Sequence, residues 1–278
     1  MRLENEFTCI MQWGGGYRDV SVHFKIENST IMKRILLIFG VLFLMTFTVS
    51  ATTWFPAEHT CPICKHKHEY QEIGSYGGYI YQWPSKYQYV YWPLTDSPSV
   101  YCCPKCYFST YMWDFDSIPE NKVDTLTKFL ATVKLKKKNK DYLDIPITTR
   151  LEIAENVYKI LGKDNEFWCQ FYRVKGYHCD QKENKDKAKE SRIKSIDIAK
   201  LMLSDSTYYG QEKENLLIIA AMNNFTGQKD SALIYLDKAS LLTYENKKLK
   251  EENVKGLDEY LTDLINQYKE FIRKGNEE

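Results

Sequence analysis

Two Cys-Pro-x-Cys motifs, at residues 61–64 and 103–106, constrain the fold of this chain more than any other feature. Each motif places two thiol groups on one tight turn, and two such turns supply the four sulfur ligands of a tetrahedral zinc ion. A shell of four cysteines leaves no open coordination position, so such a site is structural and not hydrolytic. The sequence therefore predicts a structural Zn²⁺ site with four ligands: Cys61, Cys64, Cys103 and Cys106.

The interval between the two motifs is longer than the roughly 15–20 residues of a usual zinc ribbon, so we interpret the intervening segment as an insertion. Other side chains near the motifs could also bind or exchange with an ion: His59, His66, His68 and Cys102. Because four cysteines are already paired, we interpret the histidines as surface residues and Cys102 as a spare thiol.

The insertion is rich in aromatic residues, which recur at every second position: Tyr79, Tyr81, Trp83, and then Tyr87, Tyr89 and Tyr91. This is the period of a strand with one covered face. We therefore predict a small β-rich, zinc-ribbon-like module over residues 52–118, in which aromatic rings replace a larger core. An alternative is a carbohydrate-binding surface, which would expose several of these rings together on one face.

The pattern beyond residue 118 is helical. A helix and linker are predicted for residues 119–148, and a capping-box pattern at Thr149-Arg150-Leu151-Glu152 predicts the start of the next helix, with Gly162 as its end. Further helices are predicted at about 165–180, 185–204, 211–226, 228–243 and 250–273. Cys169 and Cys179 are ten residues apart, too far for a disulfide on one helix, and are predicted to be buried thiols. The predicted fold class is α+β, mainly α.

A weak internal repeat relates residues 188–203 to residues 228–243. Small residues and a glycine between Leu216 and Ala239 resemble a tetratricopeptide repeat, in which helical hairpins stack into a curved array with a concave side. We therefore predict a tetratricopeptide-like helical domain over residues 149–278, and we expect its concave side to bind a protein or peptide partner.

Residues 32–51 are typical of a secretory signal peptide, with a short basic start, an apolar run and small residues before a cleavage site after Ala51. This predicts export to the periplasm or the extracellular space. The alternative is an uncleaved inner-membrane anchor at residues 35–51, the only case in which membrane contact is expected. Residues 1–31 are interpreted as an over-long start or a cleaved extension.

Charge and motifs argue against several classes of function. The 38 lysine and arginine residues are balanced by 37 aspartate and glutamate residues, which gives no basic field for nucleic acid. The chain lacks a Gly-x-Ser-x-Gly elbow, a His-Glu-x-x-His motif and a glycine-rich phosphate loop, and Asp114 and Asp116 are expected to face solvent. No catalytic residues are predicted. The alternative is an envelope thiol-disulfide oxidoreductase that uses one of the cysteine pairs, because an oxidising compartment favours disulfides.

The chain resembles a bacterial family of unknown function whose members join a Cys-Pro-x-Cys zinc module to a tetratricopeptide-like helical tail and are often exported. The resemblance rests on residues 61–64, Gly74-Ser75-Tyr76, residues 100–106 and Asp114-Phe115. The chain departs from the family pattern at two positions that follow the motifs and are usually glycine: Lys65 and Tyr107. The resemblance implies an architecture and carries over no catalytic residues. The expected function is an exported, non-catalytic, zinc-binding interaction scaffold.

Overall fold

The computed structural model describes residues 53–75, 84–135, 139–208, 210–246 and 249–275. The predicted signal peptide, the segment before it and the first half of the aromatic row (Tyr79, Tyr81 and Trp83) lie outside the described residues. Among the described helices, none combines the length and the apolar character needed to cross a membrane.

The strands of the described residues form three antiparallel pairs. These pairs are β1 (Thr53–Thr60) with β2 (Lys67–Ser75), β3 (Pro84–Ser85) with β4 (Val90–Tyr91), and β5 (Val100–Cys102) with β6 (Ser109–Tyr111). In the first pair Thr60 lies opposite Lys67, and in the third pair Cys102 lies opposite Ser109. Each cysteine motif is therefore the turn of a β-hairpin.

Helices account for most of the described residues, and the predicted α+β, mainly α class is confirmed. The helices are α2 (Glu120–Leu130), α3 (Ile147–Leu161), α4 (Asn165–Gln181), α5 (Lys185–Ser204), α6 (Glu212–Phe225), α7 (Lys229–Ser240) and α8 (Glu251–Lys274). The five helices predicted after Gly162 begin and end within three residues of these bounds. Periodic apolar residues and turn residues between the helices were sufficient to locate them.

The start of α3 differs from the prediction. The helix begins at Ile147, directly after Pro146, and the backbone N–H of Arg150 already donates to the Pro146 carbonyl (3.0 Å). Proline is favoured at a helix start because it lacks the N–H that would have no partner there. The capping-box pattern at Thr149 therefore lies inside the helix. The predicted end is confirmed, since Gly162 closes the helix with a left-handed φ of 77°.

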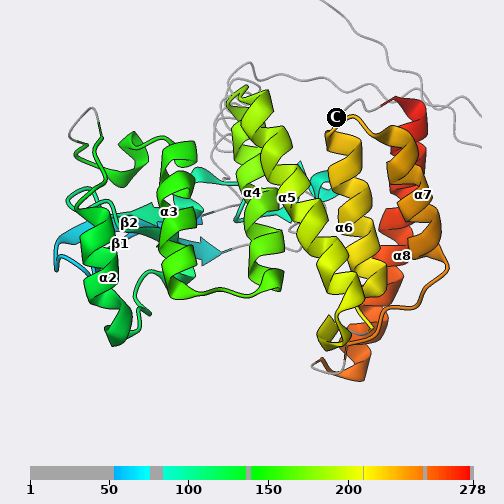
Figure 1. Ribbon diagram of the computed structural model, residues 1–278, viewed down its shortest axis with the longest axis horizontal. Helices are drawn as coiled ribbons and strands as arrows, with labels where there is room; N and C mark the ends of the chain where they lie inside the picture. Colours follow the sequence, from blue (N-terminus) through cyan, green and yellow to red (C-terminus); the bar gives the residue numbers. More distant parts are fainter. Residues whose placement is uncertain (1–52, 76–83, 136–138, 209, 247–248, 276–278) are drawn as a thin grey trace, which may run out of the picture. The chain divides into compact units, whose positions relative to one another are not determined.

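Consecutive helices from α4 to α7 pack against each other, and α8 packs on α6 and α7 (Figure 1). Helices α4 and α5 are in close contact at Gly176, where a Cβ atom would lie 3.0 Å from Cγ of Arg192 and 3.3 Å from the Ala188 carbonyl oxygen. The small residue is needed because a side chain would hold the two helices apart. Whether this array is a tetratricopeptide repeat stays a prediction.

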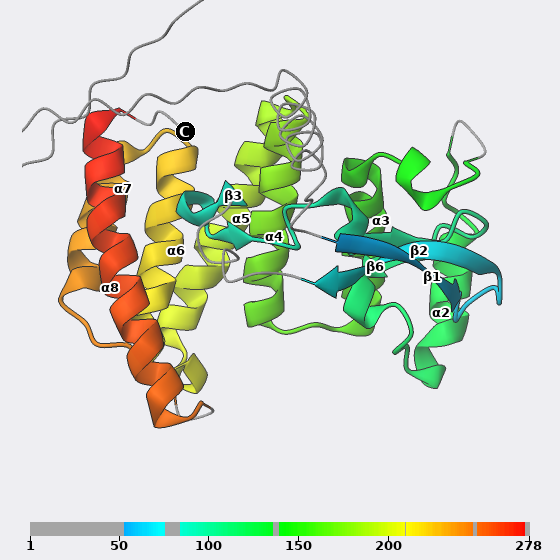
Figure 2. The ribbon, with the colours of Figure 1, turned by 180° about the vertical axis from the view of Figure 1, so that it is seen from behind.

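The described half of the aromatic row does not form the predicted alternating strand. Residues 86–88 form a 3₁₀ turn, and Tyr89 has a left-handed φ of 57°. The segment 84–91 lies against the helices (Figure 2). Tyr89 Oη donates a hydrogen bond to Glu214 Oε1 (2.7 Å), and Tyr91 Oη forms a hydrogen bond with Tyr260 Oη (2.9 Å). The Tyr87 ring stacks on the Phe271 ring, with 4.2 Å between centroids. Tyr89 is therefore buried in the helical core, and Tyr87 and Tyr91 pack against that core, so the three rings do not form the exposed face that a carbohydrate-binding surface needs.

Candidate metal centre

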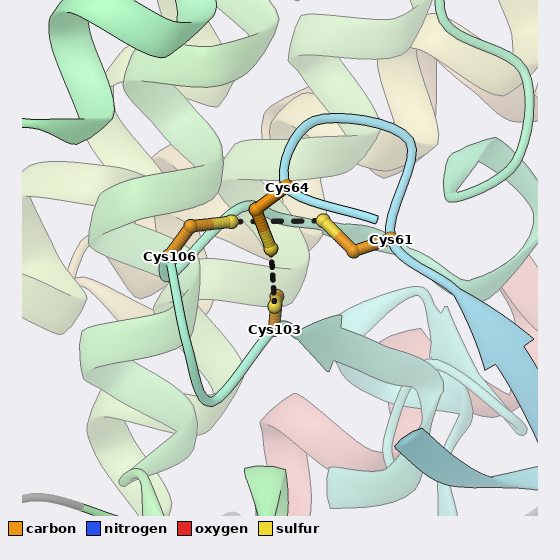
Figure 3. A group of neighbouring side chains, drawn as sticks. All are labelled: Cys61, Cys64, Cys103 and Cys106. Carbon is orange, nitrogen blue, oxygen red and sulfur yellow. Dashed lines mark hydrogen bonds between the residues drawn. The ribbon is translucent and has the colours of Figure 1, made fainter. Parts of the chain in front are cut away.

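Both cysteine motifs fold into the same backbone turn. Cys61 N–H donates to the His66 carbonyl (2.9 Å), and Lys65 N–H donates to the Cys61 carbonyl (3.0 Å). The second motif repeats the pattern: Cys103 N–H donates to the Phe108 carbonyl (2.9 Å), and Tyr107 N–H donates to the Cys103 carbonyl (2.8 Å). Each turn places its two sulfur atoms on the side that faces the other hairpin (Figure 3).

The residue after each motif adopts a left-handed backbone conformation. Lys65 has a φ of 56° and Tyr107 has a φ of 64°, and these are the two positions at which the resemblance led us to expect glycine. Glycine enters this region without steric cost, whereas a Cβ atom contacts the following carbonyl oxygen. The turn is therefore kept in this chain at the cost of local strain.

The four predicted ligands come together in one cluster. Their sulfur atoms all lie within 4.8 Å of one another, and the closest pairs are Cys61 with Cys106 and Cys64 with Cys103, each 3.6 Å apart (Figure 3). Four sulfurs around a zinc ion at about 2.3 Å would lie about 3.8 Å apart, whereas a disulfide needs about 2.05 Å. All four residues are free thiols. The donor set therefore fits a tetrahedral metal ion.

The cluster is partly shielded from water. Cys61 and Cys103 are fully buried, whereas Cys64 and Cys106 are half-buried. Hydrogen bonds from the Cys103 and Cys106 thiols lower the pKa of Cys61 to about 4, whereas hydrogen bonds with Cys103 and Cys61 raise the pKa of Cys106. The Cys61 thiol therefore loses its proton more easily than the Cys106 thiol. Binding of a metal ion requires cysteine ligands in the thiolate form, so it would release protons from the cluster.

Buried aromatic rings and two helices pack against the cysteine cluster on the side of the protein core. Tyr70, Tyr101, Phe108 and Phe115 are buried beside the cysteines, and Tyr70 stacks on Tyr101 with 4.5 Å between centroids. The same core includes apolar side chains from α2 and α3, among them Leu126, Leu130 and Val157. Both hairpins are therefore packed on helices as well as on each other.

The other candidate ligands are oriented elsewhere. Cys102 is buried, which raises the pKa of its thiol to about 12, and its sulfur lies 3.7 Å from the Tyr107 carbonyl. The ring of His59 bonds Glu72 (2.7 Å) and Asp116 (3.0 Å). With only 15% of its side chain exposed, His59 is an internal bridge, and its interpretation as a surface residue was wrong. His68 Nε2 lies 3.6 Å from Asp141 Oδ2, and with 17% of its side chain exposed His68 is likewise not a surface residue.

The two aspartates that follow the second motif do not act as a pair. Asp114 accepts hydrogen bonds from Tyr158 Oη (2.8 Å) and Lys163 Nζ (3.0 Å) and thereby connects the hairpin to α3. Asp116 bonds the ring of His59. Neither arrangement resembles an acid–base pair, and both carboxylates fix the loop after β6.

Cys169 and Cys179 are both buried on α4, as predicted. The thiol of Cys169 lies 3.5 Å from Ser195 Oγ on α5. Among the described cysteines all are free, so the spacing argument against a disulfide on one helix is confirmed.

Sequence reasoning did not identify Arg150, which holds the backbone next to the second motif. Its side chain is fully buried and donates to the carbonyls of Ile145 (2.9 Å), Ser97 (2.8 Å) and Val100. Val100 begins β5, which leads directly to Cys103. The only signal in the sequence was an arginine between apolar residues of a helix, and that pattern is also common on helix surfaces.

The fold and the site define the class of this protein: a pair of cysteine hairpins with metal-ligand geometry, joined to a stack of helices. The chain belongs to the family described as "Uncharacterized protein conserved in bacteria (DUF2225)", whose model matches residues 55–262. This agrees with the resemblance to a bacterial family of unknown function. Neither a curated protein nor a solved structure matches the chain.

Proposed function

We propose that this protein is an exported, non-catalytic scaffold in which a zinc ion bound by four cysteines fixes the two hairpins, and the helical array binds a protein or peptide in the cell envelope. The observation that carries the proposal is the cysteine cluster, in which each of the two closest sulfur contacts joins one hairpin to the other.

A structural role for the metal follows from the small size of the second hairpin. Strands β5 and β6 contain three residues each, and an isolated two-stranded hairpin is only marginally stable in water. A zinc ion crosslinks such a segment and contributes its binding free energy to folding. A closed shell of four sulfurs also gives no position for a substrate.

The redox alternative has less support. A reactive Cys-x-x-Cys pair is usually found at a helix N-terminus, which lowers the pKa of the exposed nucleophile. Here each motif is a turn between strands, and the closest sulfur contacts join different motifs. Two of the four thiols are fully buried and cannot reach a partner protein.

The scaffold role is supported by the stacked helices α4–α7 and by the absence of a catalytic constellation from the sequence motifs. Export is supported only by the signal-like residues 32–51. If the signal is cleaved as proposed, N-terminal sequencing of protein recovered from the exported fraction will begin at Thr52. A chain that begins at Met1 or Met32 and sediments with membranes would indicate the anchored form.

The zinc proposal is tested by metal analysis and thiol counting on untagged protein. We expect one zinc ion per chain, with four thiols protected from alkylation until a chelator is added. Cys103→Ser should abolish zinc binding, whereas Cys102→Ser, the same change one residue away, should retain it. Metal-free protein whose two motifs form disulfides that exchange with small thiols would reject zinc and favour the redox alternative.

A further inference from the structure

A second candidate site lies in the helical array, away from the cysteines. A cavity of about 280 Å³ opens between the start of α4, the end of α5 and the start of α6. Its lining combines polar and charged side chains with apolar ones, among them Phe167, Met202 and Ile218. Such a mixture of an apolar wall and a few polar groups is typical of ligand pockets.

The charged residues of the lining are mostly acidic, with three carboxylates, Asp164, Glu166 and Glu214, and one arginine, Arg173. Glu214 accepts a hydrogen bond from Tyr89, and Arg173 Nη1 donates to the Tyr89 carbonyl (2.7 Å). Segment 84–91 thus fixes one carboxylate and one guanidinium in place at the cavity. Burial raises the pKa of Glu214, and the hydrogen bond from Tyr89 and the charge of Arg173 oppose that rise.

A buried amide in the lining has unused hydrogen-bonding capacity. Asn215 is 2% exposed, and its Nδ2 atom has no hydrogen-bond partner among the residues that the structure describes. An unsatisfied buried donor is destabilising, so a ligand that offered an acceptor at this cavity would gain a hydrogen bond from Asn215.

The acidic lining does not suit a metal ion. Among the described residues, only the four cysteines of the hairpins are close enough together to hold one. Carboxylates spread around a cavity instead suit an organic cation, whose N–H groups can reach several acceptors. The donors Arg173 and Asn215 would accommodate an oxygen atom of the same ligand.

We propose that this cavity binds an alkylammonium group accompanied by an amide or carboxylate oxygen, as presented by a lysine residue of a peptide. The ammonium would contact Glu214 and its acidic neighbours, and the oxygen would accept from Asn215. The inference deepens the proposed scaffold function, on which it rests, because it places the peptide partner at one defined part of the array. Free lysine offers the same chemistry as a peptide, so the experiment must separate these two sources.

The test is calorimetric titration of the full chain with a blocked pentapeptide that has lysine at its centre, the same peptide with glutamate there, and free lysine. We expect the lysine peptide to bind with a dissociation constant below about 1 mM, at least tenfold more tightly than either of the other two. Equal affinity for free lysine and the peptide would overturn the peptide assignment. No binding of any of the three would overturn the site itself.

Variants connect the binding to the residues. Glu214→Gln should weaken binding of the lysine peptide at least tenfold, whereas Glu212→Gln, on the same helix but outside the lining, should change it less than twofold. Asn215→Leu should weaken binding and at the same time raise the melting temperature, because it removes the unsatisfied donor. Lower stability with unchanged affinity would assign Asn215 a purely structural role and contradict the proposal. Zinc analysis is independent of these results, so the scaffold and the cavity can fail separately.

Discussion

At the scale of single residues, His178 couples the stability of the fold to pH. Its ring bonds the Leu94 carbonyl (2.7 Å) and is 4% exposed, and burial lowers its pKa to about 4. The unfolded chain takes up a proton near pH 6.5, but the folded chain does so only near pH 4. Stability contributed by the neutral ring is therefore present above pH 6.5 and is lost as the pH falls toward 4.

We expect this group to lower the free energy of unfolding by about 3 kcal/mol between pH 7 and pH 4. Urea unfolding at a series of pH values measures the loss. His178→Gln keeps an N–H donor and cannot be protonated, so the variant should lose less stability than the parent over this range. Parallel curves for the two proteins would show that His178 is not the titrating group.

The strained turn after the first cysteine motif gives a second prediction. Lys65 is exposed and has a φ of 56°, so Lys65→Gly should stabilise the fold by about 0.5–1 kcal/mol. Lys105 is an exposed lysine inside the second motif and has no positive φ. Lys105→Gly should therefore be neutral or destabilising, because glycine gains flexibility in the unfolded chain. Thermal unfolding of both variants checks the difference, and the same effect in both would argue against strain at Lys65.

At the scale of secondary-structure elements, the contact between α4 and α5 depends on Gly176. The Arg192 side chain that a Cβ atom would meet is itself fixed by hydrogen bonds to Asp180 and Gln88, both 2.7 Å, so it cannot move away freely. Gly176→Ala should therefore destabilise the protein by about 1–2 kcal/mol despite the better helix propensity of alanine.

Gly256 on α8 provides the control for this prediction. A Cβ atom there meets nothing within 4 Å, so Gly256→Ala should stabilise the protein by about 0.5–1 kcal/mol through helix propensity alone. Chemical denaturation measures both changes. Stabilisation by both substitutions would mean that α4 and α5 can separate slightly without cost.

At the scale of the whole molecule, the metal and the helices should contribute to stability in different regions. The apolar core beside the cysteines includes residues of α2 and α3, whereas a second core joins α5 to α8. Removing a bound ion should therefore loosen the hairpins together with α2 and α3, and affect α6–α8 least.

Hydrogen exchange followed by mass spectrometry, with and without a chelator, measures this pattern. We expect loss of protection in residues 53–75, 100–111 and 120–161, and little change in residues 212–272. Without any chelator, the Cys103→Ser protein should show the same hydrogen-exchange pattern as the parent protein shows with chelator. A uniform loss of protection over the described chain would indicate a single cooperative unit.

Local sequence patterns predicted those features that depend on neighbours in the chain. The spacing within each motif identified Cys61, Cys64, Cys103 and Cys106, because a tight turn brings two thiols to the same side whatever surrounds it. Apolar periodicity located the helices after Gly162 and the mainly α fold class in the same way. The family resemblance led us to expect glycine where this chain has Lys65 and Tyr107, and that expectation also reflects a local backbone conformation, the left-handed φ of both residues.

Only the tertiary structure decided where residues distant in the sequence meet. The alternating tyrosines predicted a strand, yet Tyr89 bonds Glu214 on α6, because burial against the helices outweighs a local strand preference. Arg150 and Asn215 occupy buried positions that no short pattern distinguishes from exposed ones, because burial depends on the packing partners. The pairing of thiols within each cysteine motif was thus predictable from the sequence, whereas the meeting of the two motifs and the cavity between α4, α5 and α6 depend on tertiary packing, because their residues are distant in the chain.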